Sequence, residues 1–222
     1  MIYLKSEDVL LFQGDSITHG NRGENQSDFN HVLGHGYQFM LAGRLLLENL
    51  PRSPFIVNRG VSGDNTGRLL ARWKEDALDL RPTVLSLLIG VNNCWGCDPD
   101  APAVFAREFS ELLDRTANAL PECRLILCEP FGFLPPQEKE NPAKESLFRV
   151  ELVRACAETV RREAAAAGAV FVPFRSALAP YVEKSAPGTV IWDGVHPTVL
   201  GHEIMARCWY ETVDRSGIFT GP

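Results

Sequence analysis

Short apolar runs alternate with longer amphipathic segments along the whole chain. The apolar runs have the length and composition of buried strands, which we expect over residues 9–12, 55–58, 83–89, 124–128 and 169–172. The amphipathic segments have a helical period, which predicts helices over residues 37–50, 66–80, 102–120, 142–167 and 199–214. Strands that alternate with helices indicate an α/β protein, with a parallel sheet covered by helices on both faces.

Residues that favour helix ends mark several of these boundaries. Thr66 can cap the helix that starts there, Pro102 lies in the first turn of the next one, and Gly168 can end the helix over 142–167. Long polar loops follow two of the strands, at residues 18–36 and 130–141. In a doubly wound sheet, the loops after the carboxyl ends of strands line the binding site, so both are expected to border it.

The bulk composition is that of an ordinary globular protein. The 222 residues are enough for one sizeable core, so residues 1–222 are expected to form a single domain. The net charge of −6 argues against a nucleic-acid partner, which would require a basic surface. The chain shows neither an apolar run long enough to span a bilayer nor a leader-like start. We therefore expect a cytoplasmic protein without a membrane partner.

Short polar motifs stand where the predicted loops carry the chain past the sheet. They read Gly-Asp-Ser at 14–16, Asn-Arg-Gly-Val-Ser-Gly-Asp at 58–64, Gly-Val-Asn-Asn at 90–93 and Asp-Gly-Val-His at 193–196. A serine hydroxyl is a poor nucleophile unless a base takes its proton and a carboxylate orients that base. Ser16 is therefore the candidate nucleophile, His196 the candidate base and Asp193 the candidate orienting acid.

The same motifs contain groups that could stabilise an oxyanion. The backbone N–H groups of Ser16 and Gly60 and the side-chain amide of Asn92 can point toward a developing negative charge. Gly60 suits this role because a residue without a Cβ lets the backbone approach a ligand closely. This chemistry is acyl transfer, which needs no metal ion and no organic cofactor.

The four motifs, in this order, resemble the four sequence blocks of the SGNH hydrolases, also called the GDSL esterase/lipase family. The resemblance covers most of the chain. It implies a flavodoxin-like three-layer α/β/α sandwich around a parallel sheet of about five strands. It also implies a triad of Ser16, Asp193 and His196 with oxyanion donors at Ser16, Gly60 and Asn92, and it leaves Gly63 with a structural role.

One position departs from the family pattern. The third block usually reads Gly-x-Asn-Asp, and this chain has Asn93 in place of the final acid. That acid normally supports the geometry of its loop, and an amide can still form hydrogen bonds there without a charge. We expect retained activity with altered rigidity of the loop.

Longer stretches resemble a narrower group, the bacterial intracellular acetylxylan esterases. These stretches are residues 34–37, 58–63, 71–76, 89–95 and 192–197. The resemblance implies a homo-oligomeric serine esterase that removes acetyl groups from carbohydrate such as xylo-oligosaccharides. Three alternatives stay open: a short-chain lipase, thioesterase or acetylhydrolase acting on lipid-like esters, a non-catalytic carbohydrate-binding protein in which Asn93 marks a decayed site, and a redox protein that uses Cys94 and Cys97.

Three residues beside these motifs are candidate substrate contacts. Trp192 precedes the candidate acid and is expected to form a wall of the site. Trp95 follows the third motif, where it could stack on a sugar or an acyl group, or equally pack under a loop. Asp15 precedes the candidate nucleophile, and its more direct interpretation is a structural hydrogen-bonding group.

Other reactive side chains have a simpler interpretation. The Cys-x-x-Cys spacing of Cys94 and Cys97 lacks the thioredoxin-like surroundings of a redox motif, so we interpret it as coincidence. The remaining cysteines are expected to be free thiols in or beside the core. Loop residues His19, His31 and His35, with Asp28, match no helical metal motif and are expected to be solvated.

Overall fold

Five parallel strands form the central sheet of the computed structural model, which describes residues 1–219. The predicted strands all form, as β1 (Val9–Gly14), β2 (Phe55–Asn58), β3 (Val84–Leu88), β4 (Arg124–Cys128) and β5 (Val170–Val172). Their order in the sheet is β2-β1-β3-β4-β5, with parallel pairing throughout. This is the strand order of flavodoxin-like folds, so the predicted fold class is confirmed.

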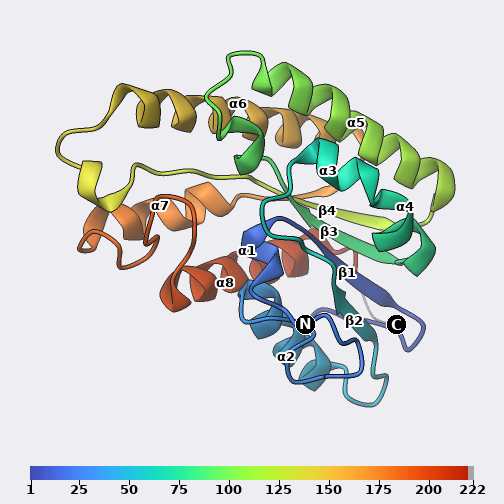
Figure 1. The fold of residues 1–222 in the computed structure, drawn as a ribbon. Helices are drawn as coiled ribbons and strands as arrows, with labels where there is room; N and C mark the ends of the chain where they lie inside the picture. The colour runs from blue at the N-terminus through green and yellow to red at the C-terminus, as the bar shows by residue number, and fades with distance from the viewer. Residues whose placement is uncertain (220–222) are drawn as a thin grey trace.

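Helices cover both faces of this sheet (Figure 1). One layer contains α5 (Ala101–Ala119) and α6 (Lys144–Ala166), which pack against each other, and α3 (Thr66–Ala71) contacts α5. The other layer contains α2 (Tyr37–Glu48), α7 (Phe174–Lys184) and α8 (Val199–Ser216), with α8 in contact with both of the others. The shorter elements are α1 (Ser16–His19), α4 (Trp73–Asp76), η1 (Leu78–Leu80), η2 (Val91–Cys94) and η3 (Pro136–Glu138).

The continuous helix predicted over residues 66–80 is wrong. The segment breaks into α3, α4 and η1, because Arg72 and Ala77 leave the helical conformation with φ angles of −113° and −136°. The cap also differs from the expectation. Asn65 caps α3 by accepting a hydrogen bond from the N–H of Arg68 at 2.9 Å, whereas Thr66 is the first residue inside the helix.

Two further elements differ from the predicted pattern. Helix α6 starts at Lys144 rather than residue 142, because Pro142 precedes the helix and Ala143 is extended. Helix α7 was not predicted at all, and it contains Pro180 in its interior, a residue that ordinarily disfavours a helix. Burial of Phe174 and Leu178 against the core supports α7 despite this.

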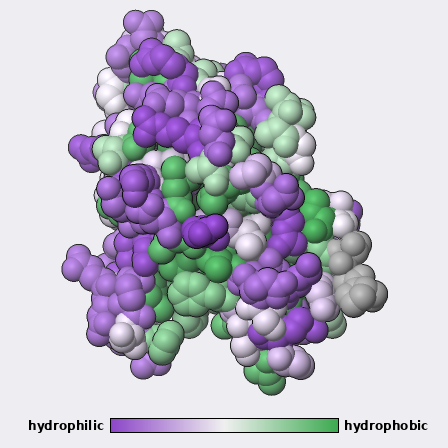
Figure 2. Space-filling view, turned by 90° about the vertical axis from the view of Figure 1, so that its right-hand side faces the viewer, coloured by the Kyte–Doolittle hydropathy of each residue, from purple (hydrophilic) through white to green (hydrophobic). Residues whose placement is uncertain are grey.

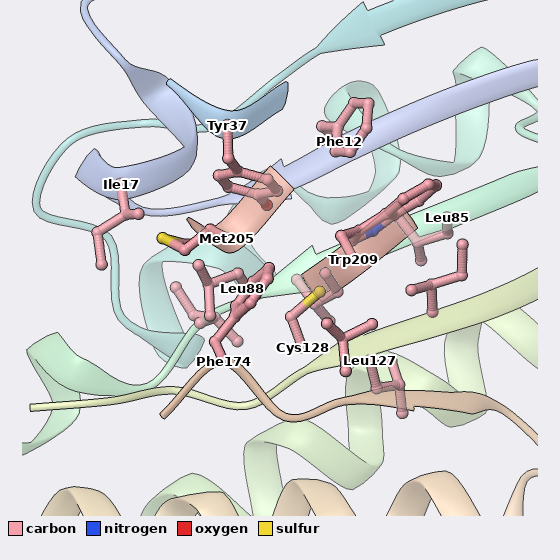
Figure 3. Close-up of a cluster of buried hydrophobic side chains, with 14 of the residues drawn as sticks. Phe12, Ile17, Tyr37, Leu85, Leu88, Leu127, Cys128, Phe174, Met205 and Trp209 are labelled. Carbon is pink, nitrogen blue, oxygen red and sulfur yellow. The ribbon is translucent and has the colours of Figure 1, made fainter. Parts of the chain in front are cut away.

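Buried hydrophobic side chains pack on both faces of the sheet, against α2, α7 and α8 on one side and against α5 and α6 on the other. Figure 3 shows Phe12 of β1, Leu88 of β3 and Cys128 of β4 on the face of the sheet that Trp209 of α8 and Phe174 of α7 cover, all of them buried. Two buried indole N–H groups, one on each side of the sheet, are paired: that of Trp209 donates to the Ser86 hydroxyl at 2.9 Å, and that of Trp73 donates to the Thr116 hydroxyl at 3.1 Å. Both tryptophans are fully buried.

The cysteines are free thiols, as predicted for the four outside the Cys-x-x-Cys pair. Cys94, Cys128 and Cys156 are buried, and Cys97, Cys123 and Cys208 are partly buried. Figure 2 shows one side of the molecule largely covered by hydrophilic residues, with a smaller hydrophobic area near its centre. Among the described residues, none of the helices combines the length and apolar character needed to cross a bilayer.

Candidate active site

The predicted serine, histidine and aspartate meet at the carboxyl end of the sheet. Ser16 follows the end of β1 as the first residue of α1, and its Oγ lies 2.9 Å from Nε2 of His196. Nδ1 of the same imidazole lies 2.6 Å from Oδ2 of Asp193. A neutral imidazole that donates from Nδ1 to the carboxylate presents an unprotonated Nε2 to the serine hydroxyl. Residues from opposite ends of the chain thus form one continuous hydrogen-bond chain.

Local backbone contacts hold the Asp193–His196 turn. Oδ1 of Asp193 accepts hydrogen bonds from the N–H groups of Val195 at 2.9 Å and His196 at 2.7 Å. Gly194 between them has φ +96°, and a Cβ at this position would lie 2.8 Å from the carbonyl oxygen of Phe133. The turn therefore needs an aspartate to cap it and a glycine to let it pack.

The same contacts keep Asp193 ionised. Burial by itself would raise the pKa of Asp193, but the hydrogen bonds from His196 and Val195 favour the charged form and together lower it. The Asp193 carboxylate can thus accept the Nδ1–H of His196 and orient the ring.

Asp15 is buried next to the candidate nucleophile. Its side chain is about 1% exposed, and Oδ1 accepts the N–H of Ile17 at 3.1 Å to cap α1. Burial raises the pKa of Asp15 to about 7, although the Ile17 hydrogen bond and the nearby His196 act in the opposite direction. The geometry favours the structural interpretation of Asp15 over a substrate contact.

The two glycines of the second motif have different surroundings. Gly60 is buried, its N–H donates to Oδ1 of Asn58 at 2.9 Å, and an added Cβ would lie 2.6 Å from the N of His19. Its N–H is therefore already engaged, unlike the free donor expected from the sequence. Gly63 is exposed with φ +83°, and within residues 1–219 its N–H makes no hydrogen bond.

The side-chain amide of Asn92 is hydrogen-bonded to Asp64, the residue after Gly63. Its Nδ2 donates to the carbonyl oxygen of Asp64 at 2.9 Å, which leaves the second N–H of the amide available to a ligand. Asn92 belongs to η2, directly after β3, so it lies at the same end of the sheet as Ser16.

Asn93 joins η2 to the start of α3. Its Oδ1 accepts the N–H of Thr66 at 3.2 Å, and its Nδ2 donates to the Thr66 hydroxyl at 2.7 Å. That hydroxyl in turn donates to the carboxylate of Glu108 on α5. The Thr66 hydroxyl has already donated its hydrogen to Glu108, so it needs a donor at position 93, which an amide supplies and a carboxylate does not. This role has no signal in the sequence, because Thr66 and Glu108 are distant from Asn93 in the chain.

Exposed tryptophans lie beside the Asp193–His196 turn. Trp192 is 60% exposed and stacks near His196, with ring centroids 6.2 Å apart. Trp95 is 54% exposed, and the guanidinium of Arg149 lies 4.6 Å above its ring. A small cavity is lined by Trp95, Arg149, Asp193 and residues of the loop after β4. The loop over 130–141 therefore borders the site, as its position after a strand predicts.

The histidines of the 18–36 loop are dispersed. His31 pairs with Asp28 at the surface, with 2.7 Å between Nδ1 and Oδ2, and the Nδ1 of His19 accepts the N–H of Asn21 at 3.1 Å. Across the part of the chain that the structure describes, no three His, Cys, Asp or Glu side chains are grouped as a metal site.

A hydroxyl, an imidazole and a carboxylate in hydrogen-bonded sequence are the arrangement that serine hydrolases share across unrelated folds. Comparison with known proteins identifies the family. Residues 12–204 match the model of the GDSL-like lipase/acylhydrolase family. The chain therefore belongs to this family, and it is a carboxylic ester hydrolase.

Individual relatives cover nearly the whole chain. It is 31% identical over 219 residues to an acetylxylan esterase of Geobacillus stearothermophilus, covering 94% of each sequence. A crystal structure of a GDSL-like lipase from Parabacteroides merdae superposes with a TM-score of 0.86 at 32% identity, over 96% of this chain and 98% of that one. A catalytic mutant of the G. stearothermophilus acetylxylan esterase, with one serine replaced by alanine, superposes with a TM-score of 0.78 at 26% identity, over 96% of each chain.

The buried Asp15 predicts a specific pH dependence of stability. The pKa of Asp15 is about 7 in the folded protein, compared with the usual 3.8 of an exposed aspartate. As the pH rises, the unfolded chain therefore loses this proton before the folded protein does. The stability that Asp15 contributes is thus complete below about pH 4 and is lost as the pH approaches 7. In Asp15→Asn, the side-chain oxygen can still cap α1 but does not titrate.

Urea unfolding of both proteins between pH 4 and 8 measures this effect. The free energy of unfolding of Asp15→Asn minus that of the wild type should increase from pH 4 to 7 by on the order of a few kcal/mol. Above pH 7 this difference should level off. A difference that does not change with pH would contradict the assigned ionisation of Asp15.

Restoring the usual acid at position 93 should destabilise this chain. In Asn93→Asp, two carboxylates compete for the one hydrogen of the Thr66 hydroxyl, and the hydroxyl oxygen loses its donor. We expect a loss of about 1–3 kcal/mol in the free energy of unfolding, measured by urea denaturation.

Glu108→Gln provides the matched control in a double-mutant cycle. A glutamine can donate to the Thr66 hydroxyl in place of the lost amide, so the double variant should recover most of the loss. Additive effects of the two substitutions would show that residues 93 and 108 are not coupled through Thr66.

Proposed function

We propose that this protein is a serine esterase that removes short acyl groups, chiefly acetyl, from carbohydrate such as acetylated xylo-oligosaccharides. The observation that carries the proposal is the hydrogen-bond chain from Ser16 through His196 to Asp193, with separations of 2.9 and 2.6 Å. Family membership supports ester hydrolysis, and a serine variant of the similar acetylxylan esterase is described as catalytic.

The reaction proceeds through an acyl-enzyme. Oγ of Ser16 attacks the ester carbonyl carbon while its proton passes to Nε2 of His196. The imidazolium, held by Asp193, then gives this proton to the departing alcohol oxygen, and the acyl group stays on Ser16. Water attacks the acyl carbon, His196 takes the water proton, and its return to Oγ of Ser16 releases the acid.

The negative oxygen of each tetrahedral intermediate needs hydrogen-bond donors. We assign this role to the N–H of Ser16 and the free N–H of the Asn92 amide. For the third donor we favour the exposed N–H of Gly63 over that of Gly60. Asn58 already occupies the N–H of Gly60, whereas Gly63 lies one residue from Asp64, the partner of Asn92.

Two features support an acetylated sugar as substrate. The flat faces of Trp192 and Trp95 are exposed beside the site, where they can stack on sugar rings. The cavity that Asp193 lines is small, which suits a short acyl group better than a lipid chain. A lipid-like ester is the competing substrate class, and assembly into a homo-oligomer stays a prediction.

A panel of esters tests this proposal directly. The wild type should release acetate from acetylated xylo-oligosaccharides, and on p-nitrophenyl esters kcat/KM should be highest for acetate and fall as the acyl chain lengthens. Ser16→Ala should lose nearly all turnover of both substrates, because no other group on the described surface of the site replaces its Oγ.

The alternatives give different results in the same panel. A maximum at longer acyl chains would favour the lipid-like ester. A folded wild type without turnover and without labelling by a serine-directed sulfonyl fluoride would favour a carbohydrate-binding protein. Loss of activity in Cys97→Ser would instead implicate the cysteine pair.

Removal of the Asn92 amide should affect the chemical step. In Asn92→Ala, kcat for p-nitrophenyl acetate should fall by about 100- to 1000-fold with KM little changed, because the oxyanion exists only along the reaction path. Steady-state kinetics measure the two constants separately. A rise in KM with unchanged kcat would show that Asn92 binds the substrate rather than the oxyanion.

A further inference from the structure

We propose that Arg72 is a positioning residue that fixes the oxyanion loop, residues 59–64, against the strand that carries the nucleophile. The inference rests on the proposed function, since it concerns the donors assigned to that reaction. Arg72 does not reach the reacting atoms itself. It acts through the backbone and side chains to which it is hydrogen-bonded.

Arg72 holds both ends of the loop. Its Nη1 donates to the carbonyl oxygen of Arg59 at 2.9 Å, and its Nε donates to Oδ2 of Asp64 at 2.7 Å. The loop between these anchors carries Gly60 and Gly63, the two candidate backbone donors. One guanidinium therefore sets the distance between the first and last residues of the loop.

The same side chain ties the loop to β1. Nη2 of Arg72 donates to Oε1 of Gln13 at 2.9 Å, and this oxygen also accepts the N–H of Gly14 at 3.1 Å. Gly14 ends the strand, two residues before Ser16. Loss of the Arg72 contacts would thus let the loop shift relative to the strand that carries the nucleophile.

The contact with Asp64 extends the effect to Asn92. While Arg72 holds the Asp64 carboxylate, the carbonyl oxygen of Asp64 accepts the Nδ2–H of Asn92 at 2.9 Å. The orientation of the Asn92 amide, and so the direction of its free N–H, depends on where Asp64 lies. Arg72 is therefore connected to the side-chain donor and to the backbone donors of the oxyanion.

These contacts require an arginine. A planar guanidinium donates in several fixed directions at once, and here it reaches Arg59, Asp64, Gln13 and Asp76, the last at 3.1 Å. A lysine in the same place has one nitrogen and cannot span these acceptors. The ion pair between Arg72 and Asp64 is also largely closed to water, with 17% of the Arg72 side chain and 7% of the Asp64 side chain exposed.

The break in the helix predicted over 66–80 fits this role. Arg72 is the residue at which α3 ends and α4 begins, with a backbone outside the helical region. The break places the residue at a corner where Gln13, Arg59 and Asp64 are all within reach. Trp73, fully buried with its N–H bonded to Thr116, anchors the next residue in the core.

Arg72→Lys tests the proposal, with Arg124→Lys as the matched control. Arg124 pairs with the buried Asp8 at 2.6 Å, and it begins β4 at the amino end of the sheet, away from Ser16. For each variant we would measure kcat and KM for p-nitrophenyl acetate, the inhibition constant of 1,1,1-trifluoroacetone, and stability in urea. Oγ of Ser16 attacks the ketone carbonyl carbon, and the resulting oxyanion occupies the place of the oxyanion that forms from the ester.

Arg72→Lys should lower kcat by about 10- to 100-fold with KM changed far less. Its inhibition constant for trifluoroacetone should rise by the same factor, because the ketone uses the same donors. Arg124→Lys should lose stability with kcat unchanged. Should Arg72→Lys fail to fold, Asp64→Asn, which weakens only the Nε contact, should show a smaller change in the same direction.

Several results would overturn the proposal. These are a folded Arg72→Lys with wild-type kcat, a fall in kcat with unchanged affinity for the ketone, and an equal fall of kcat in Arg124→Lys. Failure of the proposed function is a separate result, because it requires an inactive wild type or an active Ser16→Ala.

Discussion

Parallel pairing of β1 with both β2 and β3 is the constraint on which the site depends. In this pairing Phe12 lies opposite Asn58 and Gly14 opposite Leu88, so the three strands end at nearly the same level. The segments that follow them carry the candidate nucleophile, the 59–64 loop and the Asn92 amide. Because the strands run in the same direction, these segments leave the same edge of the sheet and meet there. An antiparallel partner for β1 would have sent one of them to the opposite edge.

The sheet brings the loops together, and side chains that bond to backbone groups then fix their shape. Asn58 binds the N–H of Gly60 and the carbonyl oxygens of Thr18 and Leu33, and Asp193 binds two N–H groups of its own turn. Arg72 binds the carbonyl of Arg59 in the same way. Donors held before the substrate arrives need no reorganisation during the reaction, which is the main source of catalysis by an oxyanion site. Buried, fully paired polar groups therefore serve the chemistry as well as the fold.

Much of this arrangement could be predicted from the sequence, and the rest depends on tertiary contacts. Each strand was visible as an apolar run, and the serine, aspartate and histidine stood out by their motifs. From the sequence, Gly60 was preferred as the donor and Gly63 was given a structural role, because the hydrogen bond from the N–H of Gly60 to Asn58 is visible only in the fold. The sequence also could not show the break at Arg72, whose acceptors come from three separate segments. Helix α7 was missed because Pro180 disfavours a helix locally. Burial of Phe174 and Leu178 against the core outweighs this weak local preference.

The proposed covalent acyl intermediate on Ser16 can be trapped during turnover. The enzyme is mixed with excess p-nitrophenyl acetate and quenched with acid within milliseconds, and the acetyl group is located by peptide mass spectrometry. The acyl-enzyme mechanism predicts one acetyl group on Ser16, formed together with a burst of p-nitrophenol if deacylation is the slower step. Acetylation of a different residue on the reaction path would contradict it. Continued turnover with no acetyl group on Ser16 would also contradict it, provided that a synthetic serine acetyl ester survives the same quench.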